Sequence, residues 1–135
     1  PQFCWQTSEK YGYASNWSQR HTAYACGLGT FSLSDGLITE KRKAVRFMSL
    51  ILEAVIQPPT RAYSHYQEWC LFYQDGSCRQ CIRRCPANAI SEAGHDKDLC
   101  AAYGQSIRAK RKVEPDRTIG CGLCQAGVPC ENRRP

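Results

Sequence analysis

All but two of the ten cysteines in this chain fall into two blocks in its second half. Thiolates are soft ligands that select zinc, copper(I) or iron–sulfur clusters. Each block has four of them, which is the number that one tetrahedral zinc ion or one cubane cluster requires. The chemistry indicated is therefore metal binding rather than acid–base catalysis. The first block is Cys70, Cys78, Cys81 and Cys85, and the second is Cys100, Cys121, Cys124 and Cys130.

The spacing within the first block favours an iron–sulfur cluster. It reads Cys78-x2-Cys81-x3-Cys85, with Pro86 directly after the last cysteine. Bacterial ferredoxins with two clusters end their cysteine run in this way, and the last cysteine of the run binds the other cluster. The blocks therefore predict two four-iron four-sulfur clusters and an electron-transfer function. The expected ligands are Cys70, Cys78, Cys81 and Cys130 for cluster 1, and Cys85, Cys100, Cys121 and Cys124 for cluster 2.

Two positions depart from the ferredoxin spacing. The usual first cysteine of the run would stand where the chain has Asp75. We expect Cys70 to replace it from a longer loop, and the alternatives are Asp75 as an oxygen ligand or a three-iron cluster. Cys130 is separated from the preceding cysteine by a longer gap than usual, and Pro129 precedes it rather than follows it. Spacing alone therefore supports Cys130 least.

Two other uses of cysteine compete with this interpretation. An even number of cysteines is typical of secreted disulfide scaffolds, but such frameworks do not call for paired Cys-x2-Cys or a terminal Cys-Pro. Structural zinc is the stronger rival, since Cys-x2-Cys pairs also hold zinc in ribbons and knuckles. Cys4 and Cys26 lie outside both blocks, and we expect them to be free, buried thiols.

The net charge of +6 is compatible with three roles for the basic residues. They can form a solvated face, dock an acidic redox partner, or contact nucleic-acid phosphates. We expect a partner such as a ferredoxin-like or flavodoxin-like donor, or a catalytic subunit, and no nucleic-acid partner. Basic side chains close to a cluster would also raise its reduction potential. The basic groups are Arg79, Arg83 and Arg84, then Arg108, Lys110, Arg111 and Lys112, then Arg133 and Arg134.

The chain offers no stretch long enough to span a bilayer. Its longest apolar run, 48–56, is short and is interrupted by Ser49 and Glu53. Thiolate clusters need a reducing compartment, so the cytoplasm is the expected location. The chain has no initiator methionine, and we expect it to be a piece of a longer protein.

Local patterns predict mixed helices and strands in the first half. A helix is expected over 17–26, capped by Ser15 or Asn16 and ended by Gly27. A short strand is expected over 37–39, then a charged loop over 41–43. The segment 45–56 reads as a strand from its β-branched content, although its length also suits a helix. The first 13 residues carry aromatic side chains without a period and are expected to be irregular.

The second half follows a ferredoxin-like pattern from about residue 63. We expect a helical turn over 79–84, a helix over 97–103 capped by Asp96, and a basic loop or frayed helix over 106–118. Pro58 and Pro59 mark a boundary between the halves. The predicted fold class is α+β, with one unit over 1–59 and a two-cluster ferredoxin-like domain over 60–135.

Several stretches together resemble one family. The match covers about residues 13–132 and is similar to reductive-dehalogenase-like and epoxyqueuosine-reductase-like proteins. It explains the position of Cys70 and the unusual spacing of Cys130. The matching stretches are Trp17-Ser18-Gln19-Arg20-His21-Thr22-Ala23-Tyr24-Ala25-Cys26-Gly27-Leu28-Gly29-Thr30-Phe31, Leu33-Ser34-Asp35-Gly36-Leu37-Ile38-Thr39, Gly76-x-Cys78-x2-Cys81-x3-Cys85-Pro86, Gly94-His95-Asp96-Lys97 and Gly120-Cys121-Gly122-Leu123-Cys124-Gln125-x-Gly127-Val128-Pro129-Cys130.

The resemblance implies two clusters that feed electrons to a corrinoid in a nitroreductase-like domain. Residues 14–56 resemble the last part of that domain, so the first unit is expected to be a partial corrinoid-domain-like segment. Arg42 stands where the family tends to have glycine, and Met48 replaces a small residue in the strand facing the cofactor. Both would crowd a corrinoid. The residues expected near a corrinoid are Gly27, Leu28, Gly29, Thr30 and Asp35.

Overall fold

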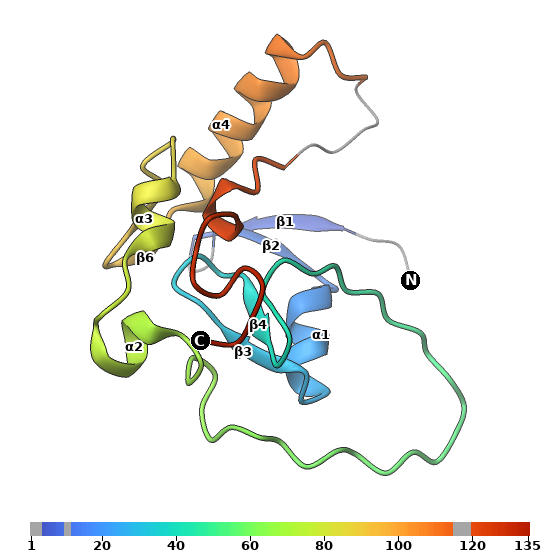
Figure 1. Cartoon of the computed structure of the whole chain (residues 1–135). Coiled ribbons are helices and arrows are strands. Elements are labelled where there is room, and N and C mark those ends of the chain that lie inside the picture. Colours follow the sequence, from blue (N-terminus) through green and yellow to red (C-terminus); the bar gives the residue numbers. More distant parts are fainter. Residues whose placement is uncertain (1–3, 10–11, 115–119) are drawn as a thin grey trace.

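The computed structural model describes residues 4–9, 12–114 and 120–135 (Figure 1). Short helices and three separate antiparallel strand pairs alternate along the chain, which is compatible with the predicted α+β class. The elements of the first half are β1 (Trp5–Ser8), β2 (Gly12–Ser15), α1 (Gln19–Ala25), β3 (Gly29–Phe31) and β4 (Leu37–Thr39). Those of the second half are α2 (Leu71–Asp75), α3 (Gln80–Arg84), β5 (Ile90–Ser91), β6 (Gly94–His95), α4 (Lys97–Lys110) and the 3-10 turn η1 (Leu123–Gln125).

The helix and the strand predicted in the first half are confirmed. Helix α1 begins after Ser18, whose hydroxyl accepts a hydrogen bond from the backbone N–H of His21, so the cap lies beyond the predicted Ser15 or Asn16. Gly27 ends it with a φ of 79°, a left-handed conformation that glycine adopts without strain. Strand β4 pairs with β3. A Cβ on Gly29 would lie 2.1 Å from the carbonyl oxygen of Ile38, so this pairing requires glycine.

The main core joins the two predicted units. Leu33 and Ile38 from the first half pack with Trp69, Cys81 and Ile90 from the second. The hydroxyl of the fully buried Thr30 accepts a hydrogen bond of 3.0 Å from the backbone N–H of Trp69. Two cysteines of the first predicted ligand set, Cys70 and Cys81, belong to this core, so the first half of the chain forms part of the site's support.

The strand predicted over 45–56 is wrong. This segment forms no helix or strand and follows a wide loop away from the body of the molecule (Figure 1). Met48 and Val55 are 90% and 101% exposed. A β-branched sequence forms a strand only where a neighbour pairs with it and covers its side chains, and no strand of the described residues pairs with this one. The segment is tied at Ser49, which accepts a hydrogen bond from the Trp17 indole and donates one to Gln19.

The N-terminal segment also differs from its prediction. Instead of an irregular leader, β1 and β2 form an antiparallel hairpin in which Trp5 lies opposite Ser15 and Ser8 lies opposite Gly12. Helix α4 lies against β2. This support comes from a helix almost a hundred residues later in the sequence, so the local pattern of aromatic residues gave no sign of it.

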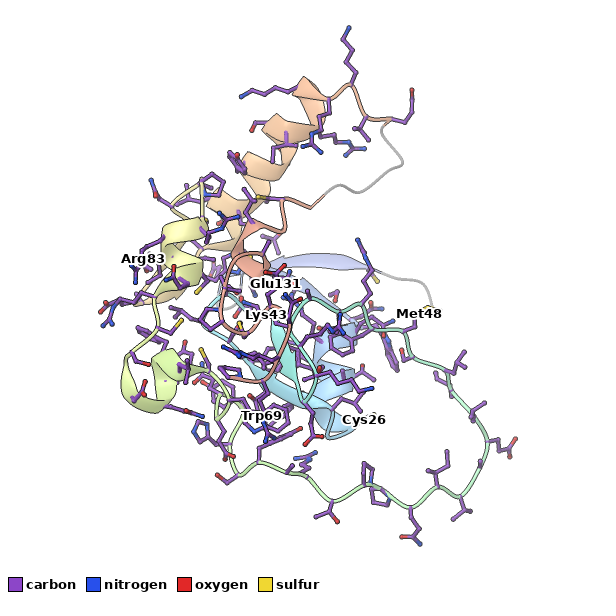
Figure 2. All side chains as sticks on the ribbon, viewed as in Figure 1. Cys26, Lys43, Met48, Trp69, Arg83 and Glu131 are labelled. Carbon is purple, nitrogen blue, oxygen red and sulfur yellow. The ribbon has the colours of Figure 1, made fainter. Side chains whose placement is uncertain are left out.

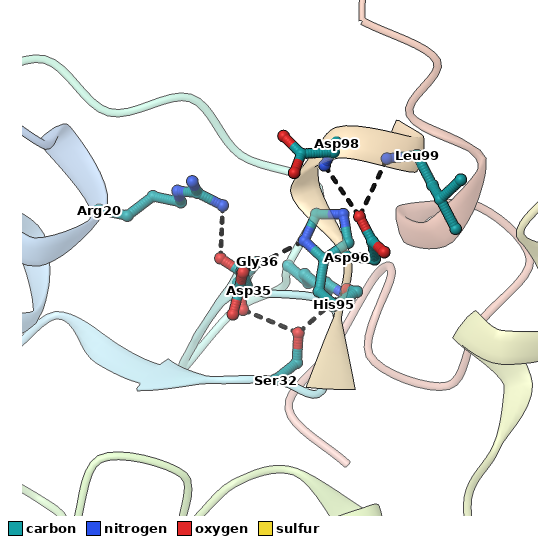
Figure 3. A network of polar contacts seen from close by, with 10 residues as sticks. Arg20, Ser32, Asp35, Gly36, His95, Asp96, Asp98 and Leu99 are labelled. Atoms are coloured by element: carbon teal, nitrogen blue, oxygen red, sulfur yellow. Dashed lines mark hydrogen bonds and ion pairs between the residues drawn. The ribbon is translucent and has the colours of Figure 1, made fainter. Parts of the chain in front are cut away.

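Helix α4 is longer than predicted. Asp96 caps it as expected, and its carboxylate accepts hydrogen bonds from the backbone N–H groups of Asp98 and Leu99 (Figure 3). The helix then continues to Lys110, so the first residues of the segment predicted as a basic loop or frayed helix are helical, while 115–119 lie outside the described residues. Helix α4 buries none of its residues, and its C-terminal end points away from the body (Figure 1). In the part of the chain that the structure describes, no helix combines the length and apolar character needed to cross a membrane.

Candidate metal centre

The first predicted ligand set lines one cavity. Cys70 precedes α2, Cys81 lies in α3, Cys78 lies in the loop between them, and Cys130 reaches the same cavity from the C-terminal segment. Phe72 lines it as well, and its other lining residues include Ile38 and Val128. Distant segments therefore bring four thiols to one largely apolar space.

Burial and mutual proximity change the acidity of these thiols. The pKa of Cys81 is raised to about 11, mainly by burial. The charge of Lys43 opposes this rise, and the neighbouring Cys70, Cys78 and Cys130 add to it. The pKa of Cys130 is raised for the same reasons, burial first. A thiol must lose its proton to bind a metal, so occupation of this cavity would release protons.

The second predicted set comes together around η1. Cys85 ends α3, Cys100 lies in α4, Cys124 lies in η1, and α3 packs against η1. The pKa of Cys100 is raised mainly by burial and then by Cys124, Cys85 and Cys121. The backbone N–H of Ala89 lies 3.3 Å from the sulfur of Cys85 and donates a hydrogen bond to it. Such bonds to cluster sulfurs tune reduction potentials.

Asp75 is poorly placed as an alternative to Cys70. Its exposed carboxylate accepts a hydrogen bond of 2.9 Å from the backbone N–H of Ser77. This bond and the hydroxyl of Ser77 hold the pKa of Asp75 below its usual value. Cys70, by contrast, is only 7% exposed and lines the same cavity as the other three thiols. The geometry therefore favours Cys70 over Asp75 as the fourth ligand.

Both predicted sets consist of four thiols. Among residues 4–9, 12–114 and 120–135, no three His, Cys, Asp or Glu side chains come close enough to hold one metal ion. A zinc ion draws four sulfurs to about 2.3 Å from one point. A cubane occupies a larger volume and holds its thiolates at separate iron atoms. Four thiols are also the donors that one four-iron cluster takes, so the donor type of each set is compatible with the predicted clusters.

Lys43 is a part of the site that sequence reasoning missed. It was expected in a charged loop, but its side chain is 1% exposed and lines the cavity of the first set. Its ammonium group donates to the hydroxyl of Ser34 at 2.5 Å and to the carbonyl of Cys124 at 3.2 Å. Its backbone N–H donates to the carbonyl of Cys130 at 2.7 Å. Nothing in the neighbouring sequence distinguishes Lys43 from the exposed Lys41.

The residues expected near a corrinoid lie around β3 and the turn that follows it. Leu28 and Gly27 line an open hollow of about 460 Å³ beside Phe47 and Trp69. Thr30 is buried in the core, and Asp35 lies in the turn beyond β3. That Gly27, Leu28, Gly29, Thr30 and Asp35 lie near a corrinoid stays a prediction.

The remaining predicted residues lie on the surface. Cys4 and Cys26 are both exposed, so the prediction that they are buried is wrong. Arg83 and Arg84 are exposed too, and Figure 2 shows Arg83 at the periphery of the molecule. The guanidinium of Arg84 donates to the carbonyl of Ala126 at 3.0 Å, which ties α3 to the second set.

A polar network joins the two halves on another face (Figure 3). The carboxylate of Asp35 lies 3.1 Å from the Nδ1 atom of His95 in β6, and Arg20 donates to the backbone carbonyl of Asp35. Burial acts to raise the pKa of Asp35. The hydrogen bond and charge of His95, together with Lys97 and Arg20, outweigh burial and lower this pKa overall.

We expect Asp35→Asn to weaken the fold at neutral pH. The lowered pKa means that the ionised carboxyl adds stability above its ordinary value of 3.8, and this stability is lost as the pH falls through the lower folded value. Because the side chain is 41% exposed, solvent screening limits the effect to within about 1 kcal/mol. Asparagine tolerates the φ of 56° at this position.

Urea unfolding of the Asp35→Asn variant at pH 7 and near pH 3 would check this expectation. Glu40→Gln is the matched control, since Glu40 pairs with Arg134 at the surface with 68% of its side chain exposed. If the Asp35→Asn variant lost the same free energy of unfolding, relative to the wild type, at both pH values, the electrostatic explanation would be contradicted.

Comparison with known proteins gives one related sequence. The epoxyqueuosine reductase of Leadbetterella byssophila is 27% identical over 114 residues, which cover 79% of this chain but 35% of that protein. The chain thus spans about a third of the length of this relative. No family model matches the chain, and no solved structure matches it. This similarity hints at a redox role for the cysteine-rich half.

Proposed function

We propose that this chain transfers electrons through two four-iron four-sulfur clusters as part of a corrinoid-dependent reductase-like protein. The observation that carries the proposal is the convergence of Cys70, Cys78, Cys81 and Cys130 on one cavity, although Cys130 is far from the others in sequence. The similarity to an epoxyqueuosine reductase supports the redox assignment. The ligands would be the two sets given above, one for each cluster.

The described residues indicate how the chain would serve such clusters. When bound, four-iron clusters accept and donate single electrons. The core around Trp69, Phe72 and Val128 would keep water away from the first set. Packing between α3 and η1 would hold the second set beside it, since α3 contributes Cys81 to one set and Cys85 to the other.

The alternative is an electron-transfer subunit or binding module of a larger redox complex that has no corrinoid. In either case a second protein or a catalytic domain must supply or accept the electrons. A ferredoxin-like or flavodoxin-like donor with an acidic docking surface would complement the net charge of +6.

Metal analysis of anaerobically purified protein tests the proposal. About eight iron and eight sulfide per chain are expected, since each four-iron cluster takes four thiolates. Corrinoid absorption bands in the visible spectrum would support the reductase assignment, and their absence would leave the electron-transfer subunit. Stoichiometric zinc in place of iron would overturn both.

A further inference from the structure

Lys43 is a buried cation that forms no ion pair with the part of the chain that the structure describes. None of the ion pairs formed by the described residues includes it. Its ammonium group donates instead to two neutral oxygens, one on Ser34 and one on the backbone of Cys124. The side chain is 1% exposed. An ammonium group buried without a counter-charge is strongly unfavourable, so a position of this kind calls for a nearby anion.

The structure gives this lysine a fixed place. A Cβ on Gly36 would lie 2.4 Å from the Cε atom of Lys43, so the glycine makes room for the lysine stem. The backbone of Lys43 pairs with Cys130, and the next backbone N–H, of Ala44, donates to the carbonyl of Glu131 at 3.2 Å. Figure 2 shows Lys43 and Glu131 near the centre of the view, and Glu131 is half-buried. The carboxylate of Glu131 accepts a hydrogen bond from the backbone N–H of Gly127.

The first ligand set would supply negative charge in the same cavity as Lys43. Lys43 lines the same cavity as Cys70, Cys78, Cys81 and Cys130, and its charge opposes the rise in the pKa of Cys81 and Cys130. Four thiolates around a cubane carry a net negative charge, which becomes larger by one when the cluster gains an electron. A fixed positive charge therefore stabilises the reduced form more than the oxidised form.

We propose that Lys43 is the built-in counter-charge of the cluster held by the first set and raises its reduction potential. This inference rests on the proposed function. The contact with the carbonyl of Cys124 also ties Lys43 to the second set, so it is a positioning residue shared by both sets. The exposed arginines at 83 and 84 lie at the surface, where solvent screens their charge.

The test is an anaerobic redox titration of the full chain, in which electron paramagnetic resonance monitors the reduction of each cluster. We expect Lys43→Met to lower the equilibrium constant for one-electron reduction of the first cluster by about tenfold or more, which corresponds to a fall of about 59 mV. Lys41→Met removes the same charge from an exposed position. It should leave the equilibrium constant for reduction of each cluster within about twofold of the wild-type value. Equal potentials in the Lys43→Met and Lys41→Met variants would overturn the proposal.

A second variant keeps the test decisive if Lys43→Met cannot assemble the cluster. Lys43→Arg keeps the charge while changing the shape of the side chain. If this variant holds iron at a potential near that of the wild type, the counter-charge is supported. If it also loses the first cluster, shape rather than charge explains the lysine and the proposal fails. Metal analysis of the wild-type protein comes before any variant is made. If it found no iron, the proposed function itself would be refuted, rather than the role of Lys43.

Discussion

Replacing Cys81 with alanine is expected to halve the iron content of the protein and to destabilise it. Cys81 is buried in the main core and lines the cavity of the first set, so its loss would remove one ligand and leave a gap in the packing. About four of about eight iron atoms should be lost, because one four-iron cluster needs all four thiolates. Metal analysis and the visible absorption of the purified variant measure this directly.

Two further variants make this result specific. Cys121→Ala should remove the other cluster, because Cys121 belongs to the set around Cys100. Cys26→Ala is the matched control, since Cys26 is exposed and lies outside both sets. It should keep all of its iron. If the Cys81→Ala or the Cys121→Ala variant retained the full iron content of the wild type, the ligand assignment would be wrong.

Removal of the iron is expected to have a comparably large effect on the fold. Cys70 and Cys81 form part of the main core, and α2 and α3 around them are helices of only five residues each. Helices this short are not stable alone and depend on their packing. Binding of a structural metal is coupled to folding, so chelation should cost several kcal/mol and lower the melting temperature by more than about 10 °C.

Thermal unfolding followed by circular dichroism, before and after anaerobic treatment with an iron chelator, provides the measurement. The control is the same chelator already saturated with iron, which shows any effect of the reagent itself. An unchanged melting temperature after complete loss of iron would mean that the core around Trp69 and Leu33 is sufficient to hold the fold without clusters.

The success of the sequence predictions depended on how local each signal was. Helix α1 with its ending at Gly27, the strand over 37–39 and the cap at Asp96 were all predicted, since each depends on a few adjacent residues. The grouping of the cysteines also agrees with the cavity and with the mutual effects on their acidity. Their role as ligands, and the division of the chain near residue 59, stay predictions.

The failures concern features that are decided by distant contacts. The hairpin of β1 and β2 packs against α4, and a contact so distant in sequence cannot be predicted from a local pattern. Segment 45–56 has the composition of a strand but lacks a pairing partner among the described residues. Lys43 is buried because Gly36 and the C-terminal segment around Cys130 surround it, and one basic residue among several gave no indication of this.

The wide loop between β4 and α2 has a consequence for how sequences of this kind can vary. Its two ends are fixed, by the pairing of Lys43 with Cys130 on one side and by the hydrogen bond from the Tyr63 hydroxyl to the Tyr24 carbonyl on the other. Loop-closure entropy grows only slowly, at roughly 0.6 kcal/mol for each doubling of length. Insertions or deletions between residues 50 and 58 would therefore change the stability of the fold little, and this stretch is where a change in chain length would be best tolerated.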